Sequence, residues 1–412
     1  MMSAKMSVPE LRFGEFCGEW ETKKLKDITS YVDYRGRAPI KTEKGHFLVT
    51  AKNIKKGLID YECSKEYVAE DDYLNVMSKG IPKIGDILFT TEAPMGNVAQ
   101  VDDKNIALAQ RVIKFRSKEM LSNAYLLHYM LSNIFQNLIL KKSIGTTVQG
   151  ISGKELHRVE VSFPSKPEQE KIASFLSSVD SKIEQLNKKK TLLEQYKKGV
   201  MQKIFSQELR FKEDDGSAFP EWVEKKLGEV VKNIGGTALE KYVSDNGEYN
   251  FISIGNYSKD GKYIDNGQRI EFNEKTQTKL LHKDDLVMVL NDKTSSGDII
   301  GSTILINDND KFIYNQRSER LTCNKELSSH YAWNYLNSTL FRKKVFAVAQ
   351  GGTQIYVNFP SVKELKIPIP SLKEQTKIAT FLSSLDKKIE LTYKEFNATK
   401  EFKKGLLQKM FV

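Results

Sequence analysis

One long sequence occurs twice in this chain: Pro164–Phe205 reads PSKPEQEKIASFLSSVDSKIEQLNKKKTLLEQYKKGVMQKIF, and Pro370–Phe411 reads PSLKEQTKIATFLSSLDKKIELTYKEFNATKEFKKGLLQKMF. The two copies align without a gap at an offset of 206 positions (370 minus 164), and about half of their positions are identical. Similarity of this length does not arise by chance, and a fixed internal offset is typical of a duplicated unit. The chain is therefore built from two related halves.

Each copy has a stripe of apolar residues at alternating steps of four and three, the heptad spacing of helices that pair along a seam. In the first copy the stripe consists of Ile172, Leu176, Val179, Ile183, Leu186, Leu193, Val200 and Ile204. In the second copy it consists of Ile378, Leu382, Leu385, Ile389, Phe396, Leu406 and Met410. Polar residues interrupt both stripes, namely Lys190, Lys197, Thr392, Thr399 and Lys403. An uninterrupted helix of this length would reach roughly 60 Å.

Two arrangements can bury these stripes. Each helix can pack only on its own domain, or the two helices can bury each other's stripes. The connection from the first helix runs through a whole module, which favours an antiparallel pair related by a pseudo-two-fold axis. We predict this pairing, with separate packing as the alternative.

The duplication extends upstream at the same offset. Gln110-Arg111 matches Gln316-Arg317, and GTTVQGIS from Gly145 lies opposite GGTQIYVN from Gly351. Between roughly 30 and 105, and between 232 and 310, the halves share almost nothing. Each half thus consists of a module whose sequence is its own, which we call the private module, and a long helix whose sequence occurs in both halves.

Each private module mixes short apolar strands with turns rich in Gly, Asn and Asp, followed by one helix. The predicted strands are 47–50, 85–91, 112–115, 249–254, 286–290 and 299–306, and the predicted helices are 123–142 and 329–348. We predict an α+β fold with two globular domains separated by two long helices that pair as an antiparallel coiled coil.

The composition suits a globular protein that has an anionic partner or is simply highly soluble. Lys and Arg number 64 against 53 Asp and Glu, which gives a formal charge of +11. An excess of positive side chains can neutralise the phosphates of a nucleic acid. It can equally serve only to keep the protein soluble. Cys17, Cys63 and Cys323 fit neither a disulfide framework nor a zinc site, the N-terminus resembles no signal peptide, and no run of 18 apolar residues occurs. We expect a soluble cytoplasmic protein.

Motifs of catalysis are missing from the sequence. There is no G-x-x-x-x-G-K-[ST] phosphate loop, and the five histidines are not at metal-ligand spacing. Asp260-Gly-Lys262 could be interpreted as the carboxylate–lysine pair of a nuclease, but such triplets are common by chance. We therefore predict no catalytic site in this chain.

The chain resembles the specificity (S) subunits of Type I restriction–modification systems. The resemblance rests on PEQEKIASFLSSVDSKIE and KEQTKIATFLSSLDKKIE, on the endings YKKGVMQKIF and FKKGLLQKMF, and on the GTT and GGT-Q segments. It implies two target-recognition domains, 1–163 and 207–369, and two spacer helices, 164–206 and 370–412. Each domain would read one half of a bipartite site in double-stranded DNA.

The resemblance also implies partners. The helices would dock two methyltransferase (M) subunits, and two restriction (R) subunits would join the complex. S-adenosylmethionine, ATP and Mg²⁺ are expected on these partners, with no cofactor, no metal and no membrane contact in this chain.

Polar loops of the two modules supply the predicted DNA contacts, because Arg suits guanine, Asn and Gln suit adenine, and Ser, Thr and Lys suit phosphates. The predicted contacts are Arg35, Arg37, Lys41, Thr91, Asn97, Gln110, Arg111, Thr146, Thr147, Gln149, Lys293, Thr294, Ser295, Gln316, Arg317, Thr353, Gln354 and Tyr356.

Two other functions remain as alternatives. A stand-alone enzyme, such as a fused methyltransferase, would bind S-adenosylmethionine without partners. A coiled-coil interaction scaffold without DNA specificity would show no affinity for duplex DNA that falls steeply with salt.

Overall fold

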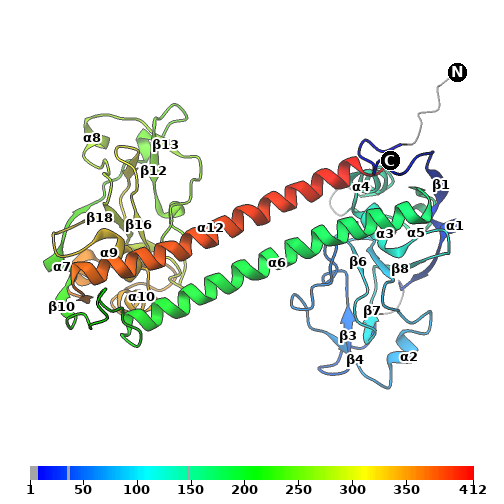
Figure 1. Ribbon diagram of the computed structural model, residues 1–412, viewed down its shortest axis with the longest axis horizontal. Helices are drawn as coiled ribbons and strands as arrows, with labels where there is room; N and C mark the ends of the chain where they lie inside the picture. The colour runs from blue at the N-terminus through cyan, green and yellow to red at the C-terminus, as the bar shows by residue number, and fades with distance from the viewer. Residues whose placement is uncertain (1–7, 35–37, 146–148) are drawn as a thin grey trace. The chain divides into compact units, whose positions relative to one another are not determined.

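The computed structural model describes residues 8–34, 38–145 and 149–412. It divides into unit 1, residues 1–188 with 393–412, and unit 2, residues 189–392. Two long helices, α6 (Lys166–Phe205) and α12 (Leu372–Lys409), each contribute to both units (Figure 1). The two predicted helices are therefore confirmed.

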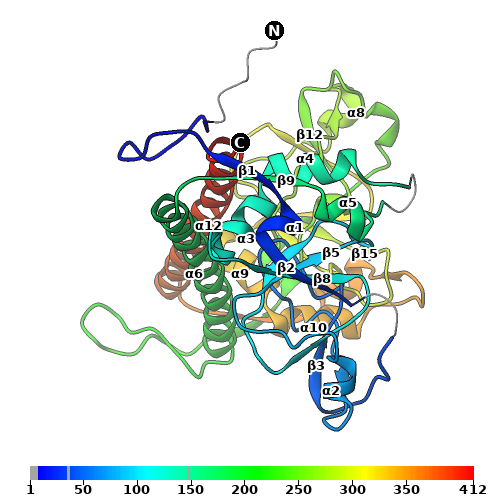
Figure 2. The ribbon, with the colours of Figure 1, turned by 90° about the vertical axis from the view of Figure 1, so that its right-hand side faces the viewer.

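The described residues of unit 1 form three sheets. A four-stranded antiparallel sheet has the order β2-β8-β5-β6, of which β2, β8 and β5 are labelled in Figure 2. A three-stranded sheet has the order β4-β3-β7 with β3 parallel to β7, and β1 pairs antiparallel with β9. The strands are β1 (Glu21–Lys24), β2 (Thr29–Asp33), β3 (His46–Val49), β4 (Tyr67–Val68), β5 (Ile87–Thr90), β6 (Val98–Gln100), β7 (Ile106–Leu108), β8 (Val112–Ser117) and β9 (Glu160–Phe163).

Strand β5 lies between two apolar cores. Ile87 and Phe89 belong to the core that includes the helices, whereas Leu88 belongs to the core shared with β3 and β7. Successive side chains of a strand point to opposite faces, so a strand covered on both sides is apolar throughout. This is why the run Ile-Leu-Phe forms a fully buried central strand.

Unit 2 repeats this plan. Its four-stranded sheet has the order β11-β18-β14-β16 and its three-stranded sheet the order β13-β12-β17, while β10 pairs with β20 and β15 with β19. The strands are β10 (Val223–Lys226), β11 (Val231–Gly235), β12 (Tyr249–Ile252), β13 (Arg269–Ile270), β14 (Leu286–Val289), β15 (Asn291–Asp292), β16 (Thr303–Leu305), β17 (Phe312–Tyr314), β18 (Ser318–Cys323), β19 (Ile355–Tyr356) and β20 (Lys366–Ile369).

The shorter helices also occur in corresponding pairs. Unit 1 has α1 (Leu25–Ile28), α2 (Tyr73–Val76), α3 (Asn123–Leu131), α4 (Asn133–Lys141) and α5 (Gly153–His157). Unit 2 has α7 (Leu227–Val230), α8 (Glu274–Gln277), α9 (Ser329–Leu336), α10 (Thr339–Ala347), α11 (Phe359–Lys363) and the 3₁₀ helices η1 (Glu240–Tyr242) and η2 (Ile254–Asn256).

The prediction of one continuous helix at the end of each module was wrong. Helices 123–142 and 329–348 are each broken in two, at Ser132 and at Ser338. Each serine accepts a hydrogen bond from the backbone N–H three residues later, at 3.3 Å from Phe135 and 3.2 Å from Phe341. Serine favours this N-cap position because its hydroxyl satisfies an N–H at the start of the helix.

The long helices pair antiparallel within each unit. In unit 1, Lys403 of α12 pairs with Asp180 of α6, and in unit 2, Lys197 Nζ of α6 lies 2.6 Å from Asp386 Oδ2 of α12. Both partners are related by the offset of 206, since Lys403 corresponds to Lys197 and Asp386 to Asp180. The lysines that interrupt the apolar stripes therefore form matching ion pairs, one within each unit.

The apolar stripes serve both of the predicted purposes. In unit 1, Ile172 and Leu176 of α6 share one core with Leu406 of α12 and with Tyr125 of α3. In unit 2, Val200 and Ile204, Ile378 and Leu382 share a core with the residues of α9. In each unit, a single apolar core therefore contains both the contact between the two long helices and the contact of these helices with the module.

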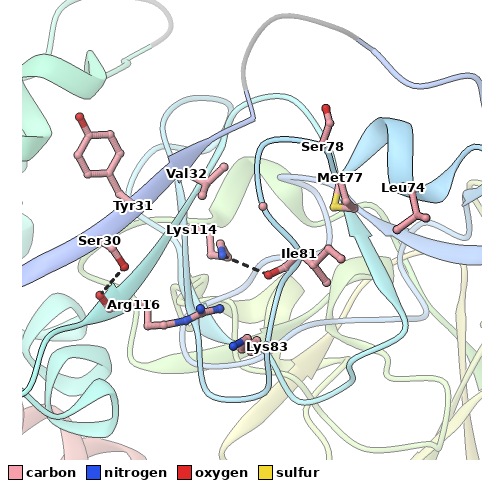
Figure 3. Close-up of a pocket in the computed structure, with 11 residues that line it drawn as sticks. Ser30, Tyr31, Val32, Leu74, Met77, Ser78, Ile81, Lys83, Lys114 and Arg116 are labelled. Atoms are coloured by element: carbon pink, nitrogen blue, oxygen red, sulfur yellow. Dashed lines mark hydrogen bonds between the residues drawn. The ribbon is translucent and has the colours of Figure 1, made fainter.

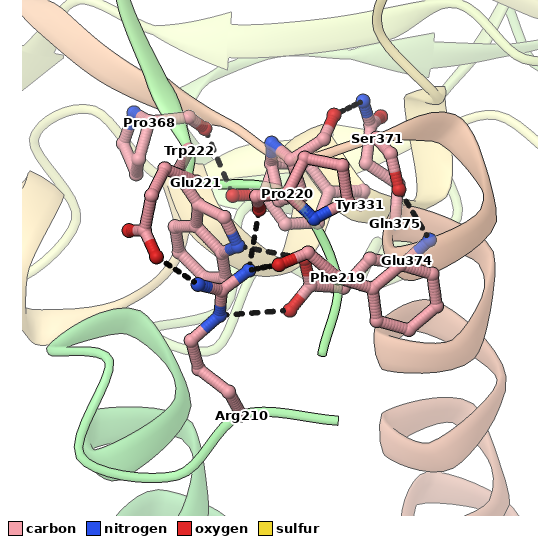
Figure 4. Close-up of polar contacts among 11 residues, drawn as sticks. Arg210, Phe219, Pro220, Glu221, Trp222, Tyr331, Pro368, Ser371, Glu374 and Gln375 are labelled. Atoms are coloured by element: carbon pink, nitrogen blue, oxygen red, sulfur yellow. Dashed lines mark hydrogen bonds and ion pairs between the residues drawn. The ribbon is translucent and has the colours of Figure 1, made fainter. Parts of the chain in front are cut away.

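The first turn of each long helix anchors it to its own module. Gln375 Nε2 donates to the carbonyls of Pro370 and Glu326, both at 2.9 Å, and its Oε1 accepts from Ser328 N at 2.8 Å. Gln169 makes the same three kinds of bond in unit 1. The buried neighbour Glu374 accepts from Arg210 and from Trp222 Nε1 (Figure 4).

Candidate nucleic-acid interface

The turn that precedes β8 in unit 1 and β18 in unit 2 has the same backbone. Arg111 and Arg317 both have positive φ, 69° and 65°, which costs energy for a residue with a Cβ. The carbonyl of Arg111 accepts from Thr91 N at 2.9 Å, and that of Arg317 accepts from Leu290 N at 2.8 Å. The surrounding loops therefore hold both arginines in this conformation.

Another loop, which follows α4 or α10, lies against the segment that donates to this turn. Ile151 N donates to Thr91 O at 3.0 Å in unit 1, and Val357 N donates to Leu290 O at 2.8 Å in unit 2. The loop is closed by a bridge between Ile144 and Gly150 in unit 1, and the corresponding bridge in unit 2 joins Gln350 and Tyr356.

These contacts bring three loops together in each unit. We call the group the three-loop cluster, which comprises residues 90–97, 109–111, 144–145 and 149–151 in unit 1 and residues 290–301, 315–317 and 350–357 in unit 2. Loops held by a rigid frame are common sites of recognition.

Most predicted DNA contacts lie in these clusters. The unit 1 cluster contains Thr91, Asn97, Gln110, Arg111 and Gln149, and the unit 2 cluster contains Lys293, Thr294, Ser295, Gln316, Arg317, Thr353, Gln354 and Tyr356. Arg35, Arg37, Thr146 and Thr147 lie outside the described residues. Lys41 lies apart from the cluster, beside the β3–β4 pair, where its Nζ is 2.9 Å from Glu66 Oε1.

Two of the predicted residues support the loops instead of facing a partner. Thr91 is buried, and its hydroxyl donates to Arg111 O at 3.2 Å. Asn97 Nδ2 donates to Ile54 O at 2.7 Å. Their side chains are committed to the backbone, so among the described residues of this cluster the exposed candidates include Arg111, paired with Glu92 at 3.0 Å, and Gln149.

The unit 2 cluster is more open. Lys293, Thr353, Gln354 and Tyr356 are all exposed. Strands β15 and β19 pair antiparallel and hold these residues on neighbouring loops. Exposed amide, hydroxyl and ammonium groups in close-set loops suit base edges and phosphates.

A carboxylate that sequence reasoning missed lies beside the unit 2 cluster and binds two of its residues. Glu240 of η1 accepts from Asn315 Nδ2 and from Gln316 Nε2, both at 2.8 Å. The hydrogen bond from Asn315 is the main cause that lowers the pKa of Glu240. Beside it is a pocket of about 320 Å³ whose lining includes Gln268, Lys293 and Arg317.

Unit 1 has a basic pocket of about 550 Å³, which sequence reasoning also missed. Figure 3 shows Lys83, Lys114 and Arg116 gathered there. Arg116 binds the buried Asp86 through two bonds of 2.7 Å, while Lys114 Nζ is 3.4 Å from Asp86 Oδ2. Burial lowers the pKa of Lys114 despite the nearby carboxylate. One carboxylate among three cations leaves a positive pocket that suits phosphate.

A comparison with protein families matches residues 18–195 and 220–400 to the Type I restriction modification DNA specificity domain. The chain belongs to this family. Each matched segment contains one private module and most of one long helix, so the duplication found in the sequence is a duplication of the specificity domain. The chain is a Type I restriction enzyme specificity subunit with two target-recognition domains.

Individual relatives agree with this assignment. The MjaVIII specificity subunit of Methanocaldococcus jannaschii is 23% identical over 419 residues, which cover 94% of this chain and 91% of that protein. The MjaIX specificity subunit of the same organism is 23% identical over 420 residues, which cover 97% and 94%.

Solved structures share the fold of this specificity subunit. The S subunit of a Type I restriction–modification system from M. genitalium matches with a TM-score of 0.62 at 18% identity, covering 98% of this chain and 99% of that one. A chain from a study of assembly and conformational transition of the type I R-M system matches with a TM-score of 0.55 at 16% identity, covering 94% and 96%. The mixed helix and strand architecture is thus that of S subunits.

The part of the chain that the structure describes has no group of three or more His, Cys, Asp and Glu side chains that could hold a metal ion. In the same residues, no helix combines the length and the apolar character needed to cross a membrane.

Proposed function

We propose that this specificity subunit reads a bipartite site in double-stranded DNA, with the three-loop cluster of each unit contacting one half-site. The observation that supports this most is that the two clusters share the backbone hydrogen bonds around their Gln-Arg turns and differ in most of their other side chains. A common frame presents its loops to DNA in the same way, and different side chains then select different bases.

The charges of the clusters support contact with the DNA backbone. Arg111 and Arg317 stand at equivalent turns, and Lys293 is exposed in unit 2. The basic pocket with Lys83, Lys114 and Arg116 adds a phosphate site in unit 1. Phosphate contacts of this kind fix the register of a protein on the duplex.

We propose further that catalysis belongs to partner subunits. Two M subunits would bind S-adenosylmethionine and methylate adenine, two R subunits would bind ATP and Mg²⁺, and this chain would hold no cofactor. Exposed apolar residues on the long helices suit such docking. They include Leu192, Tyr196 and Leu391 in unit 2 and Tyr393 and Phe402 in unit 1. Exposed apolar groups on a helix surface are typical of partner contacts.

The test is to express the chain with its M subunit in an unmethylated host and to map modified adenines by single-molecule sequencing. One bipartite motif that disappears when this chain is omitted would support the proposal. A stable complex that methylates without sequence preference, or not at all, would contradict it and favour the interaction scaffold. Binding of S-adenosylmethionine to the chain alone would favour the stand-alone enzyme.

Point variants sharpen this test. Arg111→Ala and Arg317→Ala should each weaken DNA binding by the complex and reduce the slope of log affinity against log salt by about one. Lys404→Ala is the matched control, because Lys404 is an exposed cation of α12 that pairs with Glu401 at 3.6 Å. An equal effect of all three variants would show that only net charge matters.

A further inference from the structure

The Gln316–Arg317 turn of unit 2 is fixed from three sides. Asn315 N donates to Ile252 O at 2.9 Å, Gln316 N donates to Thr237 O at 2.9 Å, and Arg317 O accepts from Leu290 N at 2.8 Å. The position of the Gln316 backbone is thus determined by three separate segments. Such support is what a residue needs to read a base with precise geometry.

The side-chain amide of Gln316 is oriented as well. Glu240 Oε1 lies 2.8 Å from Gln316 Nε2, and a carboxylate only accepts hydrogen bonds when ionised. The lowered pKa of Glu240 keeps this carboxylate ionised at neutral pH. The nitrogen of Gln316 must therefore face Glu240, which leaves its carbonyl oxygen and one N–H for a ligand.

Glu240 is itself held in place by the protein. Its Oε1 also accepts from Asn315 Nδ2 at 2.8 Å, and Asn315 Oδ1 accepts from Leu239 N at 3.0 Å. Asn315 is buried, so this chain of bonds has a rigid origin. Among the described residues, no hydrogen bond to Gln316 Oε1 is found, and this side chain lines the 320 Å³ pocket.

The equivalent place in unit 1 is built differently. Gln110 and Arg111 form the same turn, but the residue before them is Ala109, where unit 2 has Asn315. Alanine has no amide with which to hold a carboxylate. The orienting bonds from Asn315 and Glu240 therefore belong to unit 2.

We propose that Gln316, oriented by Glu240, recognises an adenine in the half-site read by unit 2. An amide that offers one acceptor and one donor matches the N6 amino group and N7 of adenine in the major groove. Glu240 acts as a positioning residue. The proposal rests on the proposed function, because it needs the unit 2 cluster to face DNA.

The test uses the full chain in complex with its M subunit and a set of duplexes in which each adenine of the motif is replaced in turn by 7-deazaadenine, which lacks the N7 acceptor. Replacement of one adenine in one half-site should lower the affinity of the wild-type complex. The loss should lie within the about 5- to 150-fold that a bidentate contact contributes. Gln316→Ala should bind the natural duplex more weakly and should be insensitive to 7-deazaadenine at that position.

Glu240→Gln tests the positioning role, because an amide at 240 also accepts the reversed orientation of Gln316. It should reduce the 7-deazaadenine effect by about fivefold or less, with preferences in the other half-site unchanged. A merely structural role would weaken binding to all sequences alike. Gln110→Ala is the matched control and should alter only the other half-site.

The outcomes separate this proposal from the proposed function. If the wild-type complex has no bipartite preference, the proposed function fails. If the preference exists but no adenine shows a 7-deazaadenine effect that depends on Gln316, only the present proposal fails. Changes in the same half-site for Gln110→Ala and Gln316→Ala would also overturn it. Unchanged preference in the other half-site shows that each variant is folded.

Discussion

Units 1 and 2 anchor their long helices with the same groups. Glu168 binds Arg12 with two bonds of 2.8 Å, and Glu374 binds Arg210 at 3.3 Å and 3.0 Å. Both carboxylates are buried. The two units nevertheless differ beside this anchor, because the indole of Trp222 donates to Glu374 at 2.8 Å, whereas Trp20 Nε1 has no hydrogen-bond partner among the described residues.

The difference is larger in the three-loop clusters. Backbone bonds at Arg111 and Arg317 are alike, yet Asn315 and Glu240 organise the unit 2 cluster where unit 1 has Ala109. Backbone bonds and buried ion pairs therefore define the frame of each unit. The side chains of the loops can then differ between the two units while the frame stays the same.

The largest expected effect tests whether the two anchors are equivalent. Glu168→Ala and Glu374→Ala should each lower the free energy of unfolding of their unit by about 3–5 kcal/mol, because a partly buried arginine loses its partner. Hydrogen exchange of α3 and α9 measures the two units separately. Glu170→Ala, at an exposed position of α6, is the control. A loss below about 1 kcal/mol in either unit would break the equivalence.

The second prediction concerns His128, which occupies the position of Asn334 in unit 2. Burial, helped by the charge of Lys403, lowers the pKa of His128 from 6.5 to about 3. The unfolded chain therefore binds a proton below pH 6.5 that the folded unit does not. Unit 1 should lose about 2 kcal/mol of unfolding free energy between pH 6.5 and 5.

Hydrogen exchange of α3 at several pH values checks this slope. His128→Asn should remove the slope, since unit 2 accommodates asparagine at this position. The same pH dependence in the variant would assign the slope to other groups.

The third prediction compares the two tryptophans. Trp222→Phe should cost about 1–2 kcal/mol more unfolding free energy than Trp20→Phe, because only Trp222 donates to a buried carboxylate. Both variants lose the same ring atoms, so the difference between them reports the hydrogen bond together with the contact of the Arg210 guanidinium, which lies 5.8 Å from the Trp222 ring centroid. Equal losses would show that the bond from Trp222 contributes nothing beyond packing.

The smallest expected effect concerns a contact of unit 2 at its helix pair. Lys262 Nζ lies 3.5 Å from Asp386 Oδ1, and Asp386 also binds Lys197. Lys262→Ala should change the unfolding free energy by about 0.5 kcal/mol or less, since the Lys262 side chain is exposed and Lys197 remains as a partner of Asp386. A chemical denaturation series checks this value. A loss above about 1.5 kcal/mol would mean that Lys262 is an essential part of the helix pair.

Much of the fold could be predicted because its signals are local. The heptad stripes predicted α6 and α12, and apolar runs predicted β5, β8 and β14. The break at Ser132 was missed because the apolar pattern continues through it, although serine is a known N-cap residue. Lys197 and Lys403 looked like interruptions of the stripes until the facing helix supplied Asp386 and Asp180.

The candidate site was predicted as a set of loops but not residue by residue. Thr91 and Asn97 have the side chains of DNA contacts, yet both bind backbone carbonyls of distant segments. Glu240 was missed because an isolated acidic residue gives no signal for DNA contact. Its role appears only from the bond to Gln316, 76 positions away.

The duplication, the two long helices and the existence of two different modules could be predicted from the sequence alone. These follow from periodicity and from the offset of 206, which are properties of the chain alone. Only the tertiary structure decided which polar groups face solvent and which hold the loops together. Burial and hydrogen bonding depend on segments far apart in the sequence, and their contacts form only when the chain packs.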